Sequence, residues 1–252
     1  MSLSNPFVRD IGATILTFVL CLAWLRLMDF FAHRKMITQH LSRKLIHIGT
    51  GPLFLLCWLL YTSSPAARWL ASLVPLAITA QFALVGLGII RDPAAVQAMS
   101  RSGDRREILR GPLYYGIVFI AATLVFWRES PVGILALMLM CGGDGLADVV
   151  GRNWGIKRIP WNTGKSWMGS LAMFAGSLVF SLIFVFLFSN LGYYSVPLIP
   201  VQTALVLTFI ALVATLVESL PIRDVDNITT TLSAIVLSWL MIQLGLWSAN
   251  FL

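Results

Sequence analysis

Two aspartates, Asp144 and Asp148, stand at the end of a long apolar stretch in the segment CGGDGLADVVGR (141–152). Their separation of four residues places both carboxylates on one face of a helix. A charged side chain costs about 2.5–3.5 kcal/mol at the centre of a bilayer, so acids beside an apolar run indicate a function. Neighbouring carboxylates repel each other without a counter-charge. Mg²⁺ would supply one, since it takes oxygen ligands from one or two carboxylates and from substrate phosphates.

A second interpretation of these acids needs no metal. Arg152 lies four residues after Asp148 and could form a salt bridge with it at the helix end. Gly142, Gly143 and Gly145 surround the first acid, and glycines there would let the backbone approach a ligand or bend the helix. The sequence favours the metal site, because ionisable residues within a membrane segment are rarely there for structure alone.

The segment GIKRIPWNTGKSWMGS (155–170) contains TGKS, the end of a P-loop motif, but Ile159 occupies the position of that motif's first glycine. The P-loop interpretation therefore fails. A basic loop followed by a helix start at 166–170 can still bind a polyphosphate. The predicted phosphate-binding residues are Arg152, Lys157, Lys165 and Ser166. The alternative is that the cations only set membrane topology, most of all Lys157 and Arg158.

Two further polar clusters lie in or beside basic loops. Arg43, Lys44 and His47 in SRKLIH lie within about one helical turn and can share a face, which suits contact with a phosphate or leaving group. The segment VESLPIRDVDNITT, near the end of the chain, contains the acids Glu218, Asp224 and Asp226. Glu218 or Asp226 could complete the metal site or act as a base, and Asn227 could contact the nucleotide.

The composition identifies the elements that must position these residues. Of the 252 residues, 58% are hydrophobic and 12% are charged, with a net charge of +7. Such a chain has too little polar surface for a soluble domain, so we expect an all-α, polytopic membrane protein forming one domain over 1–252. About 20 apolar residues per span predict eight transmembrane helices, with seven as the alternative. Their ranges are 11–32, 45–61, 69–90, 112–127, 132–149, 169–189, 201–217 and 229–248.

The basic residues set the orientation. Most of the 18 Lys and Arg residues fall in four loops, 33–44, 91–111, 151–167 and 218–227. The positive-inside rule places these loops on the cytoplasmic or stromal face and both termini on the far side. Every candidate cluster then falls on that face, which predicts the active site there. Nucleic acid is not an expected partner, because the charges are divided among short loops.

Taken together, SRKLIHIGTG, RGPLYY, FWRESPVGILALMLMCGGDGLADVVGR, IPWNTGKSWMGSLAMF and ESLPIRDVDNITTTLSA resemble the phytol/farnesol kinase family. That family is related to dolichol kinases and, more distantly, to CTP-dependent phosphatidate cytidylyltransferases. The resemblance spans about residues 43–235. It implies a kinase that phosphorylates an isoprenoid alcohol such as phytol, farnesol or geranylgeraniol. It also implies CTP as the favoured donor, with ATP and UTP as alternatives, and a role in phytol salvage for tocopherol.

By position, the resemblance implies functional roles for Asp144, Asp148, Lys165, Ser166, Glu218, Asp226 and Asn227. Asp144, Asp148 and Asp226 are the expected Mg²⁺ ligands, in a bacterial (cyanobacterial-like) inner or thylakoid membrane or a plastid membrane. Two rival functions remain, a cytidylyltransferase that makes a CDP-lipid and an ion-coupled transporter. Oligomeric state stays open, a homo-oligomer included.

Overall fold

The computed structural model describes residues 5–221 and 226–252, and almost all of its regular structure is helical. The chain divides into two compact units, Met1–Leu124 and Val125–Leu252, each of which is described by itself. The all-α polytopic membrane fold predicted from composition is confirmed.

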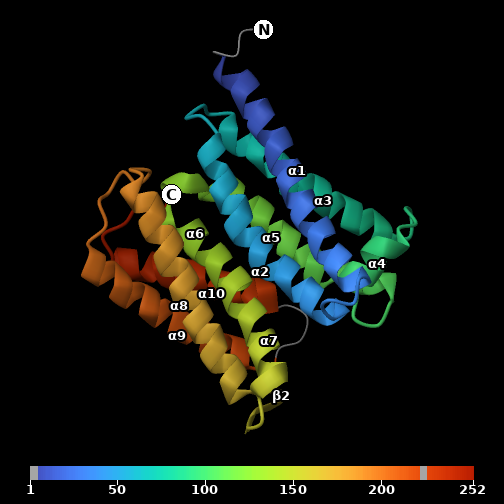
Figure 1. Ribbon diagram of the computed structural model, residues 1–252. Coiled ribbons are helices and arrows are strands. Elements are labelled where there is room, and N and C mark those ends of the chain that lie inside the picture. Colours follow the sequence, from blue (N-terminus) through green and yellow to red (C-terminus); the bar gives the residue numbers. More distant parts are fainter. Residues whose placement is uncertain (1–4, 222–225) are drawn as a thin grey trace. The chain divides into compact units, whose positions relative to one another are not determined.

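The first unit is built from four helices of 15–28 residues and several shorter ones (Figure 1). The N-terminal helix α1 begins with an Asn5 cap, whose side chain accepts the Phe7 backbone N–H at 2.9 Å, and a proline follows at its first position. Helix α3 ends at Gly88, which takes the left-handed conformation (φ 81°) that glycine adopts without strain. The elements are α1 (Pro6–His33), α2 (Gln39–Cys57), η1 (Trp58–Leu60), α3 (Ala67–Leu87), α4 (Pro93–Met99), η2 (Arg105–Leu109) and α5 (Gly111–Val125).

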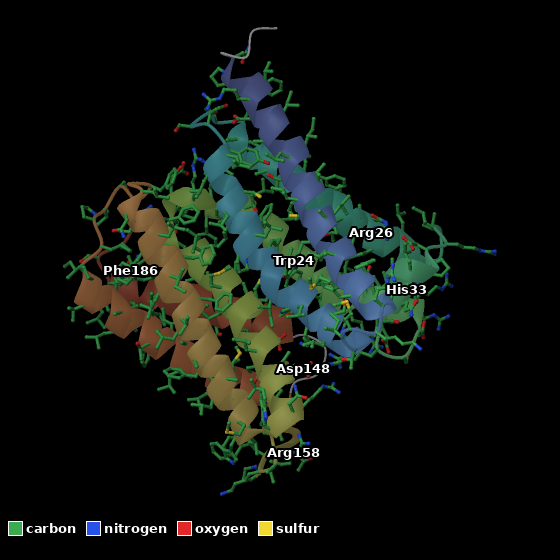
Figure 2. The ribbon with its side chains drawn as sticks, viewed as in Figure 1. Trp24, Arg26, His33, Asp148, Arg158 and Phe186 are labelled. Carbon is green, nitrogen blue, oxygen red and sulfur yellow. The ribbon has the colours of Figure 1, made fainter. Side chains whose placement is uncertain are left out.

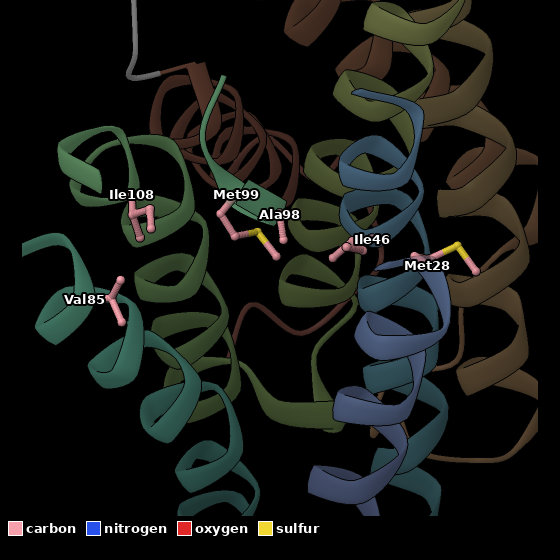
Figure 3. Close-up of a cluster of buried hydrophobic side chains, with 6 residues drawn as sticks. All are labelled: Met28, Ile46, Val85, Ala98, Met99 and Ile108. Atoms are coloured by element: carbon pink, nitrogen blue, oxygen red, sulfur yellow. The ribbon is translucent and has the colours of Figure 1, made fainter. Parts of the chain in front are cut away.

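A cluster of buried apolar side chains joins these helices (Figure 3). It takes residues from α1, α2, α3, the short helix α4 and η2, so the loop 91–111 is packed onto the helices through its apolar side. The members are Met28, Ile46, Val85, Ala98, Met99 and Ile108.

The second unit surrounds one central helical span. From Ile134 to Cys141 every side chain is fully buried, as expected for a helix that is apolar on all sides and packed among others. The span combines α6, the π-helical segment η4 and α7, and it packs against α8, α9 and α10 (Figure 1). The elements are η3 (Trp127–Glu129), α6 (Pro131–Met138), η4 (Leu139–Asp144), α7 (Gly145–Trp154), β1 (Arg158–Ile159), β2 (Asn162–Ser166), α8 (Trp167–Asn190), α9 (Pro200–Ser219) and α10 (Asp226–Gln243).

The glycines of the central span are used for close packing against α8. A Cβ atom on Gly143 would lie 2.2 Å from Ser177 Oγ, and one on Gly142 would lie 2.6 Å from the Phe180 ring. On the other side, a Cβ on Gly176 would lie 2.7 Å from the Gly142 carbonyl oxygen. These residues therefore bring two helix backbones together, and the expected bend at the glycines takes the form of a π-helical segment within a continuous span.

Six helices in the described part of the chain are long and apolar enough to cross a membrane. They correspond to the predicted spans beginning at 11, 69, 112, 132, 169 and 201. The other two predicted ranges are mostly helical: α2 and η1 cover 45–60, and α10, a shorter apolar helix, covers 229–243 and ends five residues before the predicted end at 248. The first turns of α2 carry Arg43, Lys44 and His47, which accounts for its lower hydropathy.

Contacts within each unit agree with the predicted placement of the loops on the two faces of the membrane. In the first unit, Arg43 Nη1 donates to the Ser100 carbonyl at 3.1 Å, which joins two of the predicted cytoplasmic loops. In the second unit, the predicted far-side residues meet each other. The Arg128 guanidinium lies 4.7 Å from the centre of the Tyr193 ring, and the Ser130 hydroxyl donates to the Phe251 carbonyl at 2.7 Å.

Candidate active site

Asp144 and Asp148 lie where the central span leaves the apolar core. Asp144 closes the π-helical segment, and Asp148 lies in the first turn of α7. Both side chains are partly exposed, in contrast to the fully buried residues that precede them. The helix thus carries two hard oxygen donors on one face at its polar end, and this donor set suits Mg²⁺ completed by substrate phosphates.

Arg152 forms the salt bridge that was the second interpretation of these acids. Its Nε donates to Asp148 Oδ1 at 2.9 Å, and its side chain is 58% exposed. An exposed pair spaced by four residues contributes about 0.3–0.5 kcal/mol, which is small compared with the attraction of a divalent cation for two carboxylates. The pair is therefore compatible with metal binding by Asp148. Among the residues with described side chains, no three His, Cys, Asp or Glu gather as a metal-binding cluster.

The basic loop after α7 folds as a β-hairpin, a structure not predicted from the sequence. Strands β1 and β2 pair antiparallel, with Arg158 opposite Ser166 and Ile159 opposite Asn162. Asn162 Oδ1 accepts the Gly164 N–H at 3.2 Å, an Asx-type turn contact that the sequence WNTG could have indicated. The hairpin ends where α8 begins, as expected for the predicted helix start at 166–170.

Three hairpin side chains bind the last turn of α9. Asn162 Nδ2 donates to the carbonyls of Ser219 and Leu220, both at 3.1 Å. Trp161 Nε1 donates to Ser219 Oγ at 3.1 Å. Lys165 Nζ contacts both the carbonyl oxygen and Oε1 of Glu218. Carbonyls at a helix C-terminus have no partner within the helix, so the hairpin supplies the missing donors. We call these three residues the α9 clamp.

Removal of the Asn162 amide should loosen this clamp. We expect Asn162→Ala to destabilise the protein by about 1–2 kcal/mol, because the carbonyls of the buried Ser219 and the exposed Leu220 lose their donor. Thermal unfolding in detergent and hydrogen exchange of the last turn of α9 would measure the effect. Asn153→Ala is the matched control, since that exposed amide donates to the Val149 carbonyl of its own helix at 2.9 Å. Equal shifts in the two variants would contradict a specific role for Asn162.

The predicted phosphate ligand Lys165 and the predicted base Glu218 are thus partners in the structure. Their side chains are 23% and 6% exposed, so the carboxylate is the more deeply buried group. The Lys165 ammonium and the Glu218 carboxylate thus lie together beside the hairpin. Phosphate binding by Lys165 and proton acceptance by Glu218 stay predictions.

The chain was compared with known proteins. No family model matches it, and no solved structure matches it. Curated relatives do match, over nearly the whole chain. The probable chloroplastic phytol kinase of Triticum aestivum is 42% identical over 94% of this chain and 79% of the relative. Phytol kinase 1 of Arabidopsis thaliana is 38% identical (94% and 78%), and the farnesol kinase of the same plant is 36% identical (94% and 77%).

The chain belongs to the phytol and farnesol kinase family. The predicted family is therefore confirmed, and so is the predicted enzyme class, a phosphotransferase with an alcohol group as acceptor. For this family member, the matches include both the central span and the α9 clamp, because they cover well over nine tenths of the chain.

Other predicted site residues of this family member have structural contacts of their own. The Ser166 hydroxyl caps α8 by accepting the Gly169 N–H at 3.1 Å, and its side chain is 2% exposed. The Lys157 carbonyl accepts the Trp167 N–H at 3.1 Å while the residue stays exposed. Asn227 is buried in the first turn of α10. The side chain of Asp226 lies outside the described residues, as does Asp224. Phosphate or metal contacts of these residues remain predictions.

Arg43, Lys44 and His47 belong to the first unit of this kinase-family chain. All three side chains are partly buried near the start of α2. The His47 ring lies 4.4 Å from the ring of Tyr115, whose hydroxyl donates to the His47 carbonyl at 2.7 Å. His47 thus packs against an aromatic side chain of α5. The predicted phosphate contacts of these three residues remain predictions.

Proposed function

We propose that the protein transfers the γ-phosphate of a nucleoside triphosphate to phytol or a related prenyl alcohol. CTP is the favoured donor in this proposal. The names of the relatives, which include phytol kinases and a farnesol kinase, support a prenyl alcohol as acceptor. Their chloroplast designations support a plastid membrane as the location. The product, a prenyl monophosphate, would enter phytol salvage for tocopherol and related lipids.

The observation that carries the proposal is the position of the two aspartates at the polar end of the central span. An apolar alcohol can keep its tail among the membrane helices while its hydroxyl reaches the level of the carboxylates. The phosphates of the donor would arrive at the same level from water. Phosphoryl transfer depends mainly on such positioning and on electrostatic stabilisation, which polar groups at the membrane boundary can provide.

In the proposed reaction, the alcohol oxygen forms a bond to the γ-phosphorus as the bond from that phosphorus to the bridging oxygen breaks. The nucleoside diphosphate leaves. Glu218 or Asp226 would accept the alcohol proton. Lys165 would stabilise negative charge on the phosphates. Asp144 and Asp148 would hold Mg²⁺, which when bound neutralises charge on the β- and γ-phosphates.

The test uses purified protein in detergent with Mg²⁺, three alcohols (phytol, farnesol and geranylgeraniol) and three donors (CTP, ATP and UTP). Lipid and nucleotide products are analysed together. We expect a prenyl monophosphate and an equal amount of nucleoside diphosphate. Pyrophosphate release with a CDP-lipid would favour the cytidylyltransferase. Ion flux in liposomes without nucleotide consumption would favour the transporter.

A further inference from the structure

The hairpin region exposes several large apolar side chains, Ile156 most of all. Ile156 is 95% exposed, and Trp154, Trp161 and Trp167 are 61%, 48% and 46% exposed. Exposed apolar side chains on the spans themselves are expected to face lipid tails. Ile156 and Trp161 lie between two spans, so contact with lipid tails does not explain their exposure. Exposed apolar side chains outside the spans indicate contact with a partner or a membrane.

The connectivity fixes the depth of this surface. The candidate span Pro131–Trp154 ends immediately before the hairpin region, and the span Trp167–Asn190 begins immediately after it. Figure 2 shows Asp148 and Arg158 toward one end of the second unit and Phe186 of α8 toward the other. Residues 155–166 must therefore lie at the boundary between bilayer and water. Tryptophan is enriched at that level because its ring is amphipathic.

The charge of the region determines which membrane surface fits. Between Asp148 and Glu218 the chain contains no acidic residue. Arg152 and Lys165 pair with those two flanking acids. Lys157 and Arg158 are exposed beside Ile156, and among the described residues neither forms a salt bridge. Lysine and arginine at a membrane surface attract anionic lipid headgroups.

We infer that this hairpin surface docks onto the anionic lipid headgroup layer of the bilayer in which the protein sits. The hairpin surface consists of Trp154, Ile156, Lys157, Arg158, Trp161 and Trp167. The apolar side chains enter the headgroup region, and Lys157 and Arg158 contact lipid phosphates. The inference does not depend on the reaction catalysed. It assigns Lys157 to lipid phosphate in place of the nucleotide phosphate expected from the sequence.

The experiment measures lipid contact directly in full-length protein reconstituted into liposomes. Ile156→Cys is labelled with an environment-sensitive fluorophore. Quenching is compared between lipid-bound quenchers in the bilayer and iodide in water. Vesicles of phosphatidylcholine alone and of phosphatidylcholine with phosphatidylglycerol are used. Ser102→Cys, in the polar loop RSGDRRE, is the exposed control. Cys21, Cys57 and Cys141 are buried, and the unsubstituted protein gives their background labelling.

We expect strong lipid quenching at position 156 in the anionic vesicles, weaker quenching in the neutral ones, and iodide quenching only at position 102. Replacing Lys157 and Arg158 with glutamine should lower the ratio of docked to undocked hairpin by about 30-fold in anionic vesicles. Equal quenching in the two lipid mixtures would overturn the role of anionic headgroups. Iodide access equal to that at position 102 would overturn membrane docking altogether. Loss of lipid quenching on adding CTP with Mg²⁺ would assign the cations to nucleotide.

Discussion

Asp144→Asn and Asp148→Asn are each expected to lower prenyl-alcohol phosphorylation by at least about 100-fold while the protein stays folded. Asparagine keeps the size of the side chain but removes the negative charge that would hold Mg²⁺. Each substitution also removes a charge at the membrane boundary, so stability should fall by no more than about 0.5 kcal/mol, the contribution of the Asp148–Arg152 pair. The measurement is the initial rate of prenyl monophosphate formation as a function of Mg²⁺ concentration, with thermal unfolding in detergent as the check on folding.

Two controls separate metal binding from the salt bridge with Arg152. Arg152→Gln breaks the bridge and leaves both carboxylates, so its dependence on Mg²⁺ should match that of the unsubstituted protein. Asp104→Asn applies the same chemical change at an exposed helix cap, where the new side chain can still accept the Arg106 N–H. If Arg152→Gln reproduced both the loss and the altered Mg²⁺ dependence of Asp148→Asn, the bridge rather than the metal would explain Asp148; a loss with unchanged Mg²⁺ dependence would instead fit the predicted phosphate contact of Arg152. Full turnover in either aspartate variant would reject the assignment.

Lys165→Met is expected to destabilise the protein by about 3 kcal/mol, because it leaves the buried Glu218 carboxylate without its cation. This loss lies at the lower end of the range expected when one partner of a buried ion pair is removed, because the lysine side chain is 23% exposed. Glu218→Gln should be milder, because the amide oxygen can still accept from Lys165. Thermal unfolding of both single variants and of the double variant completes a double-mutant cycle.

The double variant also tests whether Lys165 has a role beyond structure. Lys165→Met with Glu218→Gln removes both charges, so most of the lost stability should return. If Lys165 also contacts phosphate, kcat/KM for the nucleotide is lower in this double variant than in Glu218→Gln alone, which has the same change at the candidate base. Recovery of turnover together with stability would show that the lysine serves only to hold the hairpin on α9.

Hydropathy predicted the membrane helices because length and apolar composition are local properties of the chain. The start of α8 was also predictable, since Ser166 followed by an apolar run is a typical helix cap. The π-helical segment was not predictable, because periodicity gives no signal where nearly every residue from 132 to 143 is buried.

The α9 clamp illustrates a different limit. Lys165 and Glu218 are 53 residues apart, and nothing in their local sequence indicates that they meet. The hairpin is also short, with a two-residue first strand, so its β-pattern is too brief to identify. Positive-inside reasoning did place both segments on one face, and the contacts within the second unit agree with that placement.

The π-helical segment Leu139–Asp144 determines which direction the two aspartates face. Each residue of an α-helix turns the chain by about 100°. If the same residues formed α-helical hydrogen bonds in place of the wider π-helical ones, α7 would turn by about that angle relative to the buried part of the span. Asp144 and Asp148 would keep their spacing but point elsewhere. The wide turn therefore sets the direction of the carboxylates, and a substitution that restored an α-helical turn here should be tolerated less than exchange of one apolar side chain for another.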